Sequence, residues 1–239
     1  MGLRTRLRAQ IVAALPERVK PALRSVRGTV LASAATPRTR RSTRSSSRLT
    51  TAEVAVEEQY RQRLEQDPND ERAFRELVDI VRRRAAEGHE DGDPRRAADD
   101  AVWALAEEVA GNHRAWYPLI ELARLSLHDD REAALRRLGT AAERDESGHA
   151  LAEGLAMLRH EGMPGEALNL GVGHWRPREH SIEAGHHLVK AAVEAGRVAE
   201  ARRHLKAFEL HPDQGAVSRA RAELEREIAA ADRRSAPPA

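Results

Sequence analysis

Apolar residues recur along this chain at every third or fourth position, which is the spacing of amphipathic α-helices. Runs in which apolar and polar residues alternate, as they do in strands, are absent from the sequence. Proline, glycine and capping residues divide the pattern into about ten helical segments, so the sequence predicts an all-α fold. The expected helices are Thr50–Gln66, Glu71–Ala86, Arg95–Ala110, His113–His128, Arg131–Arg144, His149–Glu161, Pro164–His174, Ile182–Ala195, Val198–Leu210 and Ala216–Ala231.

Several of these helices have a recognisable start. Asp70 and Asp130 stand directly before expected helices, where an aspartate carboxylate is able to accept a hydrogen bond from the first backbone N–H groups. Ser181 has the same position before Ile182. The sequence therefore predicts side-chain caps at all three residues.

Two stretches of the helical region share one spelling. Gly162–Ala167 and Gly196–Ala201 both read G-x-x-x-E-A, and they lie 34 residues apart. In each, the glycine is expected to end one helix and the Glu-Ala pair to open the next. A fixed period of this length is typical of helix-turn-helix arrays, in which each repeat buries its apolar face by stacking on its neighbours.

The repeats resemble the tetratricopeptide (TPR) family in a degenerate form, over residues 50–233. TPR units place an aromatic residue early in the first helix with a leucine three residues later, and small residues where the two helices cross. The matching positions are Phe74/Leu77, Trp116/Leu119, Gly162/Ala167 and Gly196/Ala201, with partial matches at Tyr60/Pro68 and Ala207/Pro212. The sequence departs from the pattern at Gly185, where an aromatic is expected, and at Trp175–Pro177. An irregular helical bundle remains the alternative.

The resemblance implies a solenoid whose first helices line a concave groove, and it predicts which side chains face a partner. Basic residues outnumber acids there, so the groove is expected to bind the carboxylates of an acidic peptide or of a protein's C-terminus. Equally, these arginines could pair with neighbouring acids on solvated faces. The expected partner-binding residues are Arg72, Arg75, Arg82, Arg83, Arg114, Tyr117, Arg124, Arg159, His186 and Lys190, with Asp79, Glu121, His149, His160 and Glu183 beside them.

Composition agrees with one helical domain and excludes any chemistry that needs a cysteine. The chain has 239 residues, of which 41% are apolar and 33% charged, and it has no cysteine. Disulfides and thiol chemistry are therefore excluded, and a cytoplasmic location is expected.

Charge is distributed very unevenly. Residues 1–48 hold 12 basic residues and one acid, a charge of +11, whereas the remainder holds 28 basic and 37 acidic residues, a charge of −9. The sequence thus divides into a basic, partly disordered arm over residues 1–49, a helical domain over 50–233 and a loose tail over 234–239. The arm begins with an apolar stripe flanked by arginines, which suits the surface of an anionic membrane. The stripe and its flanks are Leu3, Arg4, Leu7, Arg8 and Ile11.

Three interpretations of the arm remain open. It is a solvated tail, a reversible anchor on anionic lipid, or a non-specific contact to nucleic acid. Residues 1–48 contain no aromatic side chain to stack on bases, which makes nucleic acid the weaker partner. The arm could also fold onto the acidic body and be displaced by a partner.

Catalytic and metal-binding patterns are missing from the sequence. There is no glycine-rich phosphate loop and no nucleophile elbow. The best histidine cluster is His186, His187 and His204, but adjacent histidines point about 100° apart on a helix. We therefore expect no cofactor, no metal and no catalytic residue. The sequence favours a non-enzymatic scaffold or adaptor, cytoplasmic, with peripheral membrane contact through its arm; the alternative is a nucleic-acid-associated helical regulator that uses the Arg-rich arm.

Overall fold

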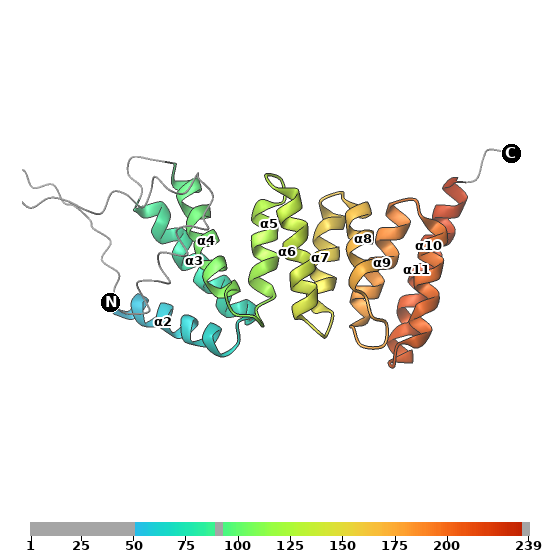
Figure 1. Cartoon of the computed structure of the whole chain (residues 1–239), viewed down its shortest axis with the longest axis horizontal. Helices are drawn as coiled ribbons and strands as arrows, with labels where there is room; N and C mark the ends of the chain where they lie inside the picture. Colours follow the sequence, from blue (N-terminus) through green and yellow to red (C-terminus); the bar gives the residue numbers. More distant parts are fainter. Residues whose placement is uncertain (1–50, 89–92, 236–239) are drawn as a thin grey trace, which may run out of the picture. The chain divides into compact units, whose positions relative to one another are not determined.

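The computed structural model describes residues 51–88 and 93–235, and these form ten α-helices, one short 3-10 turn and no strand (Figure 1). The all-α prediction is confirmed for this part of the protein. The predictions for the arm, with Leu3, Arg4, Leu7, Arg8 and Ile11, lie outside the described residues, as does most of the predicted tail. The helices are α2 (Thr51–Gln66), α3 (Glu71–Glu87), α4 (Pro94–Ala110), α5 (Tyr117–Ser126), α6 (Arg131–Arg144), α7 (His149–His160), α8 (Pro164–His174), α9 (Ile182–Glu194), α10 (Val198–Ala207), η2 (Phe208–Leu210) and α11 (Gln214–Ser235).

Helix ends follow the local signals at most boundaries. Asp70 accepts a hydrogen bond from the N–H of Ala73, and Asp130 accepts one from the N–H of Ala133, so both predicted caps are confirmed. Gly162 and Gly196 end their helices with φ angles of 70° and 73°, a left-handed conformation that glycine adopts without strain.

The predicted cap at Ser181 is wrong. Its side chain makes no capping bond to α9, and its Oγ is buried without a hydrogen-bond partner. The backbone of Ser181 is used instead, because its N–H donates to the carbonyl oxygen of Ser147 at 2.7 Å.

Helix α5 begins at Tyr117, later than the sequence predicted. The side chain of Asn69, in the connection between α2 and α3, reaches across to this point. Its Oδ1 accepts from the N–H groups of Trp116 at 2.7 Å and Tyr117 at 3.1 Å, and its Nδ2 donates to the carbonyl oxygen of Arg114 at 2.9 Å. The cap therefore comes from a distant residue, which fixes Arg114 in the turn before the helix.

The helices pack in the order in which they occur in the sequence. Each contacts mainly the next helix or the next but one: α5, α7, α9 and α11 form one line of contacts, and α6 contacts α8. Figure 1 shows α5 to α9 side by side in this order, with α10 and α11 beyond α9. This neighbour packing is what a stack of helical hairpins requires.

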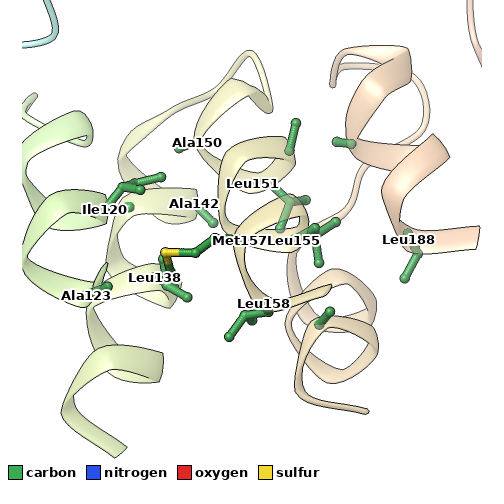
Figure 2. Close-up of a cluster of buried hydrophobic side chains, with 14 of the residues drawn as sticks. Ile120, Ala123, Leu138, Ala142, Ala150, Leu151, Leu155, Met157, Leu158 and Leu188 are labelled. Atoms are coloured by element: carbon green, nitrogen blue, oxygen red, sulfur yellow. The ribbon is translucent and has the colours of Figure 1, made fainter. Parts of the chain in front are cut away.

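Leucines at corresponding positions fill the core between the helices. Leu77, Leu122, Leu155 and Leu188 are all exposed by 3% or less. The last three are separated by 33 residues each. Figure 2 shows Leu155 and Leu188 among the buried side chains that join neighbouring hairpins. The burial of one such leucine contributes about 1.5–3 kcal/mol, so these side chains add substantially to the cohesion between neighbouring hairpins.

Gly185 departs from the predicted repeat pattern, and two neighbouring rings explain why. A Cβ atom on this residue would lie 2.6 Å from Cζ2 of Trp175 and 2.8 Å from Cε1 of Phe208. The two rings, which pack against each other with centroids 5.6 Å apart, occupy the space that an aromatic on α9 would otherwise fill. The aromatic mass is therefore present, but it comes from the flanking segments.

Among the helices that the structure describes, none combines the length and the apolar character that crossing a bilayer demands.

Candidate functional site

The residues expected to face a partner fall into distinct environments. Arg159, His186 and Lys190 lie on α7 and α9 and contact acids. Arg75 and Arg124 lie around the hydroxyl of Tyr117. The remaining residues, Arg72, Arg82, Arg83 and Arg114, are exposed on α3 and just before α5.

Lys190 belongs to a charge network between α9 and α11. Its Nζ lies 2.8 Å from Oε1 of Glu223 and 3.0 Å from Oε1 of Glu227, and the Nε2 of His186 lies 3.4 Å from the same Glu223 oxygen. Burial works to lower the pKa of Lys190, but the hydrogen bonds to Glu223 and Glu227 and the charges of these carboxylates together raise it. The ammonium is charged and already neutralised by α11.

Arg159 is bound just as completely. Its Nε and Nη2 donate to the two carboxylate oxygens of Glu194 at 2.9 and 2.5 Å. Its Nη1 lies 2.7 Å from Nδ1 of His187, and because a guanidinium cannot accept a hydrogen bond, the ring nitrogen must be the acceptor. Burial, and then the charge of Arg159, lowers the pKa of His187 to about 4. At this end of the predicted groove, internal pairing is therefore the correct interpretation.

Tyr117 is placed differently from the prediction. It is only 7% exposed and belongs to the core, with its ring edge-on to Phe74 at 5.6 Å and to Trp116 at 5.9 Å. Burying the ring between α3 and α5 removes a large apolar area from water, and the edge-to-face contact with Phe74 stabilises the packing of the two helices further. It is not a partner-binding side chain on a free surface, and this corrects the prediction.

The hydroxyl of Tyr117 lies between two ion pairs. Burial, then the carboxylates of Glu121 and Glu71, raises the pKa of Tyr117, while Arg75 and Arg124 oppose the shift. Arg75 pairs with Glu71, and Nη2 of Arg124 lies 3.5 Å from Oε1 of Glu121. The structure thus brings Arg75 and Arg124 to one place, where each keeps a partner on its own helix.

Three exposed arginines of α3 differ from Arg75 and Arg84 of the same helix, which pair with Glu71 and Glu57. Arg72, Arg82 and Arg83 are exposed positions of α3, off the stripe formed by its buried Ala73 and Leu77. Within the described residues, neither their guanidinium groups nor that of Arg114 has a carboxylate at ion-pair distance. These four side chains are the part of the predicted site that is free to contact another molecule, and we call them the arginine surface.

Sequence reasoning missed two polar side chains that hold the structure beside this surface. One is Asn69, described above. The other is Arg144, whose Nη1 donates to the carbonyl oxygens of Ala110 at 3.0 Å, Asn112 at 3.1 Å and Ala115 at 2.9 Å. These carbonyls belong to the last residue of α4 and to the turn after it, and they lack helical partners, so Arg144 closes that helix. Neither role has a local signal in the sequence.

Asp145, Ser147 and His149 are the residues that most nearly resemble a catalytic triad. Ser147 Oγ lies 2.6 Å from Oδ1 of Asp145 and 3.0 Å from Nδ1 of His149. In a triad the carboxylate orients the histidine, whereas here it accepts the hydrogen bonds of Ser147 and of the Ala150 N–H at 2.7 Å. The cluster therefore forms the start of α7. Across the described residues, no group of three metal-binding side chains is placed to hold an ion.

A cleft of about 400 Å³ lies between α10 and α11. Its floor is apolar, formed by Leu205 and Ile228. Its charged rim is paired, because Arg202 contacts Asp232 and Arg221 contacts Glu209 at 3.1 Å. The cleft therefore offers less uncompensated charge than the arginine surface does.

Comparison with family models, with curated proteins and with solved structures gives no match to this protein. The TPR resemblance stays a prediction, and the function has to be argued from the surface itself.

Proposed function

We propose that this protein is a non-enzymatic interaction scaffold that binds an acidic segment of a partner protein, a peptide or a C-terminus, on the arginine surface. The observation that carries the proposal is the contrast in pairing. Arg159 and Lys190 are bound by acids of neighbouring helices, whereas Arg72, Arg82, Arg83 and Arg114 are exposed and lack carboxylate partners among the described residues. The proposal includes a TPR-like stacking of the hairpins, which the neighbour packing supports.

A guanidinium group suits this role because its donors match the geometry of a carboxylate, and both oxygens can be bound at once. A single exposed ion pair contributes only about 0–1 kcal/mol, so one arginine would not hold a partner. Three arginines on one helix face, with a fourth before α5, give the several contacts that a specific acidic segment needs. Such a site is expected to weaken as salt is raised.

Charge reversal tests the proposal. The variant Arg72→Glu/Arg82→Glu/Arg83→Glu should lose binding to proteins that co-purify with the wild-type protein from its native cell, measured by quantitative mass spectrometry. Glutamate is a good helix former, so α3 should persist, as circular dichroism would verify.

The matched control is Arg178→Glu/Arg219→Glu/Arg233→Glu, which makes the same change in net charge at exposed positions elsewhere. Equal loss in both variants would mean that general charge, not the arginine surface, attracts partners. Retention of every partner by the α3 variant would contradict the proposal.

For the arm we propose reversible docking on anionic membrane, a proposal that rests on the sequence alone. The test is co-sedimentation of the full-length protein with vesicles containing phosphatidylserine. Replacing Leu3, Leu7 and Ile11 with serine should remove most of the bound fraction, because charge without an apolar stripe binds only weakly. If binding persists after that replacement and extends to DNA, the arm is a phosphate-binding segment and the nucleic-acid alternative is favoured.

A further inference from the structure

Two histidines lie at opposite ends of the interface between α7 and α9. His187 is on α9 and contacts Arg159 near the end of α7, through the bond of 2.7 Å described above. His180 is in the connection before α9 and packs against Gly148, directly before α7. Together with the contact between α8 and α9, this interface joins the α7–α8 hairpin to the α9–α10 hairpin.

The contact at His187 depends on a neutral ring. Its Nδ1 accepts a hydrogen bond from Nη1 of Arg159, so the ring proton is on Nε2. A second proton would go to Nδ1 and would face a guanidinium at hydrogen-bond distance, with two donors and two positive charges in contact. Protonation of His187 therefore ejects Arg159 from its present position.

His180 is even less able to hold a charge. It is 1% exposed, and its Nε2 has no hydrogen-bond partner among the residues that the structure describes. The ring fits against Gly148 so closely that a Cβ atom there would lie 2.6 Å from the Cβ of His180. Its Nδ1 accepts a long bond of 3.4 Å from the N–H of Arg176. An imidazolium at this site would have neither water nor an acceptor for its new charge.

The charged groups around the two rings oppose protonation on balance. Burial lowers the pKa of His180, Arg176 and His174 lower it further, and Asp145 and Glu179 counteract this only in part. The carboxylate of Asp145 is already engaged by the N–H of Ala150 and by Ser147.

Around His187 the balance has the same sign. Burial and Arg159 depress its pKa, His186 and Lys190 add to the effect, and Glu194 opposes them. That acid is itself bound by Arg159. The pKa of His186 is also lowered. Burial and then Lys190 lower it, while Glu223 and Glu227 of α11 oppose this.

We propose that the α7–α9 interface is a proton-sensitive joint, closed while His180 and His187 are neutral and opened when they bind protons. Opening releases α9, α10 and α11 from α7 and leaves α3 to α6 folded. The inference goes beyond the binding role proposed above, because none of these residues belongs to the arginine surface. It predicts a change of shape on passing from a neutral to a mildly acidic environment.

The size and sign of the effect follow from linkage. A group whose pKa is depressed in the closed state binds a proton more tightly in the open state. The closed state is therefore most stable above the ordinary pKa of the group, and it loses stability as the pH falls below that value. For His187 the ordinary value is 6.5 and the closed-state pKa is about 4. Between pH 7.5 and pH 5, this residue alone raises the opening equilibrium about 30-fold.

Hydrogen exchange of the full-length protein, corrected for the chemical effect of pH on exchange, tests the joint. Between pH 7.5 and pH 5, amides of α9 and α10 should lose protection by about 30-fold or more. Amides of α3 and α5 should keep theirs. The variant His187→Asn retains a carbonyl acceptor for Arg159 but cannot be protonated, so it should remove most of the loss. Adding His180→Asn should remove the remainder.

The control variant is His160→Asn, which changes an exposed histidine on α7 and should behave as wild type. If the double variant is unfolded at pH 7.5, the single His187→Asn variant decides, since His187 is only partly buried. Unchanged protection of wild-type α9 at pH 5 would overturn the proposal. So would equal loss in α3, which signals general acid unfolding, or an identical loss in His187→Asn.

Discussion

The two ends of the helical region are joined by different means. From α5 to α11, α5, α7, α9 and α11 contact one another in turn, and Leu122, Leu155 and Leu188 recur every 33 residues. The α3–α4 hairpin meets the rest chiefly through α4 against α5. There three individual side chains add long-range contacts to the helix packing: Asn69 at the start of α5, Arg144 at the end of α4, and the ring of Tyr117 against Phe74.

The difference follows from the spacing of the buried leucines. Leu77 and Leu122 are 45 residues apart, because α4 is long and is preceded by an additional connection. Where the period is kept, ion pairs also join residues about one repeat apart, as Arg131 does with Glu166 and Arg159 with Glu194. Where it is broken, Arg75 and Arg84 of α3 still pair with Glu71 and Glu57, but no described acid lies at ion-pair distance from Arg72, Arg82 or Arg83.

Leu155→Ala should have the largest effect, because Leu155 is fully buried in the regular part of the stack. The loss of burial together with the cavity should cost about 2–5 kcal/mol of the free energy of unfolding. Urea denaturation followed by circular dichroism measures it. Leu210→Ala, at a 49% exposed position, is the control and should change little. A similar cost for both would mean that the buried leucines spaced 33 residues apart do not hold the helices together.

Asn69→Ala tests the irregular junction and should cost less, about 1–3 kcal/mol, because it removes a cap and leaves backbone groups without partners. The loss should be local: hydrogen exchange of the amides of Trp116 and Tyr117 should accelerate more than that of α9 amides. Asn169→Ala, an exposed asparagine of α8, serves as the comparison. Uniform acceleration along the whole protein would show that the junction is not a separate unit.

The pair Arg131–Glu166 should give the smallest effect. Both side chains are partly solvated, at 52% and 29% exposure, so a double-mutant cycle with Arg131→Gln and Glu166→Gln should return a coupling of about 0.2–1 kcal/mol that falls as salt is added. A coupling of several kcal/mol would show that ion pairs one repeat apart direct the stacking, rather than accompany it.

The sequence predicted what local chemistry decides. Helices followed from apolar spacing, and their ends from Asp70, Asp130 and the glycines of the repeated motif. The start of α5 could not be predicted, because its cap comes from Asn69, 47 residues earlier in the sequence. Ser181 has the residue type of a cap, but its side chain is buried without a partner.

Charge pairing was the least predictable feature of the candidate site. Composition identified the basic residues, but only the packing of α11 against α9 brings Glu223 and Glu227 to Lys190. Similarly, Tyr117 has a residue type that suits either a binding surface or a core, and the neighbouring Phe74 decides for the core. Such choices depend on which helices meet, and a single sequence does not state that.

The absence of a side chain at Gly185 also constrains how this gene could change. Repeat arrays commonly lengthen or shuffle by duplicating or exchanging whole hairpins, because each hairpin contacts only its neighbours. A duplicate of α9–α10 would need its own Trp175 and Phe208 equivalents to fill the space beside the glycine, and a hairpin from elsewhere in the protein would bring Leu119 or Ala152 to this position, against two rings that leave no room for a side chain. The α9–α10 hairpin is therefore not interchangeable with the others. Variants in which recombination exchanges this hairpin should be destabilised and lost by selection.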